Sequence, residues 1–191
     1  VVPQTIWKYD DVSHNQEGKK ELNKIIDGNV FDSPKPYQLI NRILELATDK
    51  NSIIIDSFAG SGTTAHAVLN LNKIDEGNRK FILIEMEDYA NTITAERVKR
   101  VINGYGENKK VEKTVGRFDY FELGDNMFLE NNMLNQAVGI ESILKYIWYS
   151  ETRTSYFFSN NLEEVNYRIG SKDQTDYYFY YNKNETTTKN G

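Results

Sequence analysis

The chain has 191 residues, of which 39% are hydrophobic, with a mean hydropathy of −0.64 and a formal net charge of −5. This composition predicts a protein long enough to bury a core, without the ~20 consecutive apolar residues of a membrane span. Its charge gives no general attraction to nucleic acid, and the absence of cysteine excludes disulfides and thiolate metal sites and favours a cytoplasmic location.

The first part of the chain changes character near residue 32. Residues 1–31 show little apolar periodicity, and we predict that they form a connector from a region upstream of Val1. Pro34 and Pro36 then precede apolar residues at helical spacing, which predicts a helix over residues 36–48 because proline is tolerated in a first helical turn.

The centre of the chain alternates between strand-like and helix-like segments. Residues 52–56 and 81–84 are short apolar runs typical of parallel strands buried on both faces. Apolar spacing predicts helices over residues 61–72 and 88–102. The order strand, helix, strand, helix predicts an α/β fold with a right-handed parallel crossover.

The remaining sequence predicts a smaller α+β appendage. Alternation over residues 117–123 indicates a further strand, and apolar spacing over residues 134–148 indicates an amphipathic helix. The last part is rich in aromatic residues, which favour strands, and ends in a frayed tail over residues 185–191. We therefore expect a core over residues 32–125 and an appendage over residues 126–191.

Two further expectations concern isolated polar residues. The basic groups Lys19-Lys20, Arg97 with Lys99-Arg100, and Lys109-Lys110 are predicted to lie on ordinary solvated faces. His66 is predicted to pack on or near its helix without a chemical role.

A glycine-containing turn follows the first strand and begins the next helix. Gly60 and Gly62 remove the Cβ atoms that would keep a ligand from the backbone amides. The hydroxyls of Ser61, Thr63 and Thr64 are expected to cap the helix. Asp56 ends the strand at the carboxyl edge of the sheet, where open α/β folds bind ligands.

Two more segments are expected to meet this turn. Glu85 ends the second strand, where a carboxylate can accept hydrogen bonds from both ribose hydroxyls. Residues 32–36 offer small polar groups, a cation and a positive helix terminus. A ligand with a ribose and a carboxylate would use all three, and S-adenosylmethionine has both.

Other nucleotide ligands fit the turn less well. A phosphate-binding P-loop needs a lysine where Thr63 follows Gly62, and a dinucleotide fingerprint survives only through the permissive Ala65. A dinucleotide-dependent oxidoreductase is therefore the weakest alternative.

The sequence resembles a known family in these same segments. The stretch Phe31-Asp32-Ser33-Pro34-Lys35-Pro36, followed by a helix and Asp56-Ser57-Phe58-Ala59-Gly60-Ser61-Gly62-Thr63-Thr64-Ala65, resembles motifs X and I of β-class DNA amino-methyltransferases. Residues 71–73, 77–83 and 96–102 are similar to the adenine-N6-specific modification subunits of type III restriction–modification systems. The similarity covers about residues 5–125 well and implies a Rossmann-like S-adenosylmethionine-dependent methyltransferase fold.

The resemblance also implies which residues bind the cofactor. Ser33, Pro34, Lys35 and Pro36 would line the methionine end of S-adenosylmethionine. Asp56, Phe58, Gly60, Gly62 and Thr63 would surround its amino-acid and sulfonium portion, within a cofactor-binding stretch that includes Ala59, Ser61 and Thr64. Glu85 would hold the ribose hydroxyls.

One element of the family pattern is absent from this sequence. The only prolines are Pro3, Pro34 and Pro36, so the chain contains no Asp-Pro-Pro-Tyr-type catalytic tetrapeptide. In the β arrangement this motif precedes motif X and is expected upstream of Val1, so we assign no catalytic residue and no metal ligand. The chain is then predicted to be inactive alone.

The expected partners follow from the resemblance. They are DNA (contacted mainly by the upstream region), a restriction subunit and a second modification subunit, with no membrane. The alternative is an assembly module that acts through residues 134–181, whose aromatic side chains belong to a core or a subunit contact.

Overall fold

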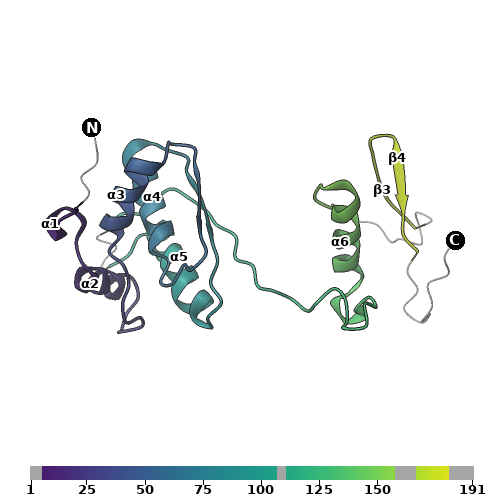
Figure 1. The fold of residues 1–191 in the computed structure, drawn as a ribbon, viewed down its shortest axis with the longest axis horizontal. Helices are drawn as coiled ribbons and strands as arrows, with labels where there is room; N and C mark the ends of the chain where they lie inside the picture. The colour runs from purple at the N-terminus through teal and green to yellow at the C-terminus, as the bar shows by residue number, and fades with distance from the viewer. Residues whose placement is uncertain (1–5, 107–110, 158–166, 181–191) are drawn as a thin grey trace. The chain divides into compact units, whose positions relative to one another are not determined.

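A computed structural model describes residues 6–106, 111–157 and 167–180 of the chain (Figure 1). It divides into two compact units, Val1–Tyr120 and Phe121–Gly191, which we describe separately. In the described ranges, every helix is too short or too polar to cross a bilayer.

The segment expected to be a connector contains two helices, α1 (Tyr9–Val12) and α2 (Asn15–Ile25). Leu22 and Ile25 on α2 are fully buried in the main core, so this segment is part of the first unit and the connector prediction is wrong for residues 15–25. The sequence pattern does not predict α2, because only a few apolar residues mark its buried face and one position of that face is a glycine, Gly18.

The central α/β elements follow the predicted order. They are α3 (Tyr37–Ala47), β1 (Ile53–Asp56), α4 (Thr63–Asp75), β2 (Lys80–Leu83), the π-helix η1 (Ala90–Ala95) and α5 (Glu96–Asn103). Strands β1 and β2 pair in parallel, with Ile54 opposite Phe81, which confirms the predicted parallel crossover. Helices α3 and α4 lie side by side in Figure 1 and contact each other.

The two-stranded sheet is covered on one face only. Ile54 and Phe81 pack against the buried residues of α3 and α4. On the opposite face Ile53, Ile55 and Ile82 are 61%, 64% and 49% exposed. The expectation that both strands are buried on two sides is therefore wrong, because in the described chain helices contribute to one face alone.

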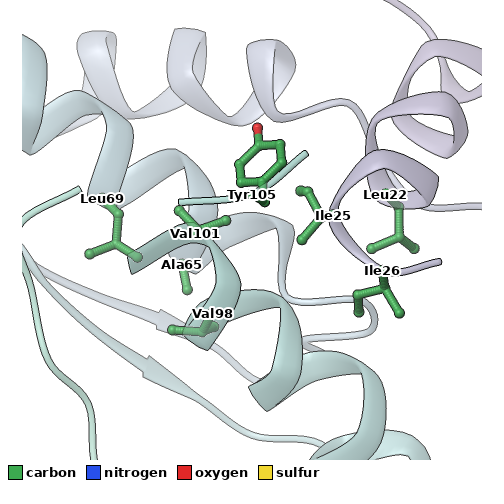
Figure 2. Close-up of a cluster of buried hydrophobic side chains, with 8 residues drawn as sticks. All are labelled: Leu22, Ile25, Ile26, Ala65, Leu69, Val98, Val101 and Tyr105. Carbon is green, nitrogen blue, oxygen red and sulfur yellow. The ribbon is translucent and has the colours of Figure 1, made fainter. Parts of the chain in front are cut away.

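The main core joins α2, α4 and α5, as Figure 2 shows. Its buried members are Leu22, Ile25, Ile26, Ala65, Leu69, Val98, Val101 and Tyr105. Full burial of a leucine, isoleucine or valine side chain contributes about 1.5–3 kcal/mol to stability. Because these residues come from segments far apart in sequence, the core fixes α2 against the helix that follows the glycine turn.

The second unit contains a 3₁₀ turn η3 (Gln136–Val138), the helix α6 (Ile140–Thr152) and the antiparallel hairpin of β3 (Arg168–Lys172) and β4 (Thr175–Tyr178). Leu144, Trp148 and Ile169 form its buried core, so part of the aromatic sequence is core as expected. The tail over residues 185–191 lies outside the described residues.

Residues 117–123 do not form the expected strand. Among the described residues no strand pairs with this segment, and the side chains of Phe121 and Leu123 are exposed. A β-strand needs a neighbouring strand for its backbone hydrogen bonds, and alternation of apolar and polar residues does not by itself provide one.

Candidate functional site

The turn between β1 and α4 is held in shape by two carboxylates. Asp56 accepts a hydrogen bond from the Phe58 amide on Oδ1 at 3.1 Å and from the Thr64 hydroxyl on Oδ2 at 2.5 Å. Glu85, just after β2, accepts from the Gly60 amide on Oε2 at 2.7 Å. The structure therefore brings together the strand-end acids and the glycine turn, as the sequence predicts.

Glu85 has less free capacity than expected. Its Oε1 atom also accepts from the amides of Met86 at 2.9 Å and Glu87 at 3.1 Å, so three backbone N–H groups bind this carboxylate. A carboxylate offers about four acceptor positions. The side chain of Tyr89 is a further hydrogen-bond partner of Glu85, so a ribose hydroxyl can bind this carboxylate only in exchange for one of its present partners.

Most amides of the turn bind the protein itself. Besides the bonds of Phe58 and Gly60 to carboxylates, the Ala59 amide donates to the Ile84 carbonyl at 3.0 Å and the Gly62 amide to the Ala59 carbonyl at 2.8 Å. This corrects the expectation that the turn presents these N–H groups to a ligand. A turn with occupied donors suits a ligand without phosphate groups, because phosphate binding uses free backbone N–H groups.

The predicted capping of α4 by hydroxyl side chains is also wrong. The N-cap is Gly62, in a left-handed conformation with φ +77°, and no side chain caps the helix. Thr64 donates to Asp56 instead, and the Thr63 hydroxyl donates to the Lys35 carbonyl at 3.2 Å. These hydroxyls tie neighbouring segments to the turn.

The loop over residues 33–36 packs on α2. A Cβ atom at Gly18 would lie 2.7 Å from the Pro34 carbonyl oxygen and 2.9 Å from the Pro36 nitrogen, so only a glycine permits this approach. Pro34 and Pro36 are fully buried, while Ser33 and Lys35 are exposed. Helix α2, which the sequence pattern does not predict, thus supports this loop.

Burial separates the predicted site residues into two groups. Those accessible to a ligand are Ser33, Lys35, Asp56, Phe58, Gly60 and Glu85; those buried are Pro34, Pro36, Ala59, Ser61, Gly62, Thr63 and Thr64. Phe58 is 84% exposed at the edge of the sheet. The buried group can hold the site in shape but cannot contact a ligand without a rearrangement.

Two polar side chains beneath the turn are fully buried, His66 on α4 and Arg97 on α5. The prediction that Arg97 lies on a solvated face is wrong. Burial lowers the pKa of His66 well below its ordinary value, and the charge of Arg97 lowers it further. Burial also lowers the pKa of Arg97 to about 10, so Arg97 remains charged at neutral pH.

The sequence held one weak indication of this arrangement. Arg97 lies directly before Val98 and four residues before Val101, on the face that α5 buries. Since a charged residue is rarely buried, its place beside this apolar stripe did not by itself predict burial.

Comparison with known proteins points to one family. A family model described as a DNA methylase matches residues 1–96. The Mod subunit of the type III restriction-modification enzyme StyLTI of Salmonella typhimurium is 52% identical over 79 residues, which are 41% of this chain and 12% of that protein.

Two further relatives are Mod subunits of the same type. That of EcoPI, from Escherichia phage P1, is 39% identical over 89 residues, which are 47% of this chain and 14% of that protein. The probable HindVI Mod subunit of Haemophilus influenzae is 36% identical over 127 residues, which are 62% of this chain and 15% of that protein. The chain therefore spans between 12% and 15% of the length of these relatives.

Proposed function

Because the chain belongs to the N6/N4 DNA methylase family, we propose that its first unit binds S-adenosylmethionine for methyl transfer to the N6 atom of adenine in double-stranded DNA. The relatives named as type III Mod subunits support the further proposal that the chain is part of a modification subunit. DNA, a restriction subunit and a second modification subunit are then its proposed partners.

The observation that carries this proposal is the meeting of three segments at one edge of the sheet. The Lys35 carbonyl joins the loop over residues 33–36 to Thr63, and Glu85 joins the end of β2 to Gly60. All of these residues lie within the part matched by the family model.

The accessible residues suit a cationic ligand. Asp56 and Glu85 place two carboxylates at the rim, which favours a sulfonium and an amino group electrostatically. The exposed ring of Phe58 can contact a cation or stack on a flat base. Ser33 and Lys35 are exposed and available for a ligand carboxylate, and Glu85 can accept from a ribose hydroxyl in exchange for one of its present partners.

In methyl transfer, the proposed cofactor and the residues of this chain have different roles. S-adenosylmethionine supplies a methyl group on a positively charged sulfur, which is electrophilic without a metal ion. The residues of this chain bind and orient that donor and shield it from water at the Phe58 side. The sequence has no Asp-Pro-Pro-Tyr-type tetrapeptide, so we propose that the chain does not act on the adenine amino group.

Calorimetric titration of the chain with S-adenosylmethionine and with S-adenosylhomocysteine tests the proposal. We expect saturable binding of both, no methylation of DNA, and loss of binding in Gly62→Val, whose side chain would meet the Thr94 backbone. Thr175→Val, in the hairpin of the second unit, is the matched surface control. A folded wild-type chain that binds neither compound would refute the proposal.

A second candidate function, an assembly module, is favoured by the second unit. Tyr149, Tyr178 and Tyr180 are 56%, 61% and 58% exposed there, and tyrosine is enriched at protein–protein interfaces. We expect light scattering to detect self-association that weakens in Tyr149→Ser and Tyr178→Ser. A wild-type chain that stays monomeric at high concentration would exclude self-association as this role.

A further inference from the structure

A buried cation lies directly beneath the glycine turn. The Arg97 side chain is fully buried, and its Nη1 atom donates to the Ser61 hydroxyl at 3.0 Å and to the Thr63 hydroxyl at 2.9 Å. The same nitrogen lies 3.4 Å from the Ser61 carbonyl oxygen, and Nη2 lies 3.1 Å from Nδ1 of His66. Every one of these acceptors belongs to the turn or to the first two turns of α4.

The balance of charge around Arg97 is unusual for a buried cation. Within the described ranges it forms no ion pair at salt-bridge distance, and the negative group that acts on it is Glu21, through space. Burying a charge without a close counter-ion is unfavourable, so the hydrogen bonds to the turn offset much of that penalty. The energetics therefore tie the position of the guanidinium to the conformation of residues 61–66.

A second residue of the same segment holds the same turn. Thr94, in the π-helix η1 three residues before Arg97, donates from its hydroxyl to the Gly60 carbonyl at 2.5 Å. Its own carbonyl oxygen lies 3.0 Å from the position of a Cβ at Gly62. Single π-helical turns inside helices often occur at functional sites, and this one sets the Thr94 backbone against the turn.

The hydrogen bonds of Arg97 also connect to the loop over residues 33–36. Thr63, which accepts from Arg97, donates from the same hydroxyl to the Lys35 carbonyl. Arg97 and Lys35 are thus linked through one hydroxyl group. This link joins the loop over residues 33–36 to the glycine turn without any contact of Arg97 with solvent.

We propose that Arg97, assisted by Thr94, is a positioning residue that fixes the loop over residues 33–36 and the glycine turn in the arrangement that binds the methyl donor. The inference rests on the proposed function, because the arrangement matters only if the donor binds there. Arg97 is too deeply buried to touch a ligand, so it acts through Ser61 and Thr63.

A matched pair of variants separates positioning from simple stabilisation. Arg97→Met removes the hydrogen bonds to the turn and keeps most of the side-chain volume. Arg79→Met is the control. Arg79 is also buried and hydrogen-bonded, to Asp75 at 2.9 Å and to Thr48 at 3.0 Å, but it lies directly before β2 and makes none of these bonds to the glycine turn. Both variants are expected to unfold at lower denaturant concentrations than the wild type.

Their affinities for S-adenosylhomocysteine, measured by calorimetry where both are fully folded, are expected to differ. Arg97→Met should bind at least about tenfold more weakly, the loss that corresponds to one hydrogen bond to a charged group. Arg79→Met should stay within about twofold of the wild type. In the ligand-free chain, the amide NMR signals of Gly60 and Gly62 should shift in Arg97→Met and not in Arg79→Met.

Thr94→Val and Arg97→Lys keep the test decisive if Arg97→Met fails to fold. Thr94→Val removes one hydroxyl, and Arg97→Lys keeps the charge while losing the forked donor. Each is expected to weaken binding by several-fold.

The inference is overturned if these folded variants bind like the wild type, or if Arg79→Met loses as much affinity as Arg97→Met. A folded wild-type chain that binds no S-adenosylhomocysteine overturns the proposed function and the inference together. A wild-type chain that binds while the variants are unaffected overturns the inference alone.

Discussion

Replacing Gly62 by alanine perturbs the turn in two ways that the structure separates. The backbone of Gly62 has φ +77°, a conformation that side chains rarely adopt. In addition, the new Cβ would lie 3.0 Å from the Thr94 carbonyl oxygen and 3.4 Å from its Cγ2 atom. Gly60, in the same turn with φ +53°, has the first problem only, because its Cβ would meet Phe31 at an ordinary 3.5 Å.

These geometries give different free energies for the two substitutions. The left-handed conformation costs about 1–2 kcal/mol for a residue with a Cβ. Overpacking against a backbone that must shift adds about 1–3 kcal/mol at Gly62. We therefore expect Gly62→Ala to lower the free energy of unfolding by about 2–5 kcal/mol and Gly60→Ala by about 1–2 kcal/mol.

Denaturant unfolding of the first unit measures this difference. The chain has two tryptophans, Trp7 in the first unit and Trp148 in the second, so Trp7 fluorescence in a Trp148→Phe background reports on the first unit. Equal losses for Gly62→Ala and Gly60→Ala would refute the conclusion that the close approach of the Thr94 backbone adds to the cost of a side chain at position 62.

Three other substitutions or conditions test the packing. Leu22→Ala should lower the free energy of unfolding by about 2–5 kcal/mol in the same assay, because Leu22 is fully buried. Leu46→Ala, at an exposed position, should lower it by under about 1 kcal/mol. Equal values would place α2 outside the core. Ile54→Ala should destabilise more than Ile55→Ala, by about 1–2 kcal/mol, since Ile54 packs against the helices and Ile55 is 64% exposed; the reverse order would contradict the one-sided sheet. Since the pKa of His66 in the fold lies well below 6.5, the unfolded chain binds the proton first, and the free energy of unfolding should fall by up to about 1.4 kcal/mol per pH unit as the pH drops from about 6.5 to 5. Titrations of the wild type and His66→Gln between pH 5 and 8 would contradict this if both had the same slope.

The parts of the fold with strong local signals could be predicted from the sequence. The apolar runs that end in Asp56 and Glu85, with the glycines between them, define β1, α4 and β2 and bring the acids and the turn together. Each signal lies within a few residues of the element that it predicts.

What the sequence did not reveal depends on distant partners. Gly18 reads as a helix-weakening residue until Pro34 and Pro36 pack on it. Arg97 reads as solvated until its acceptors on the turn surround it. Ile55 reads as buried on two sides, because an apolar run does not say whether a second layer covers it.

The central claim is that a methyl donor binds at the turn between β1 and α4. An NMR titration of the isotope-labelled chain with S-adenosylhomocysteine tests it most directly, because it locates the ligand residue by residue. The account predicts saturable shifts of the Phe58, Gly60 and Met86 amides, with those of β3 and β4 unchanged. No shifts at saturating ligand, or shifts confined to residues outside the turn, the loop over residues 33–36 and the end of β2, would contradict it.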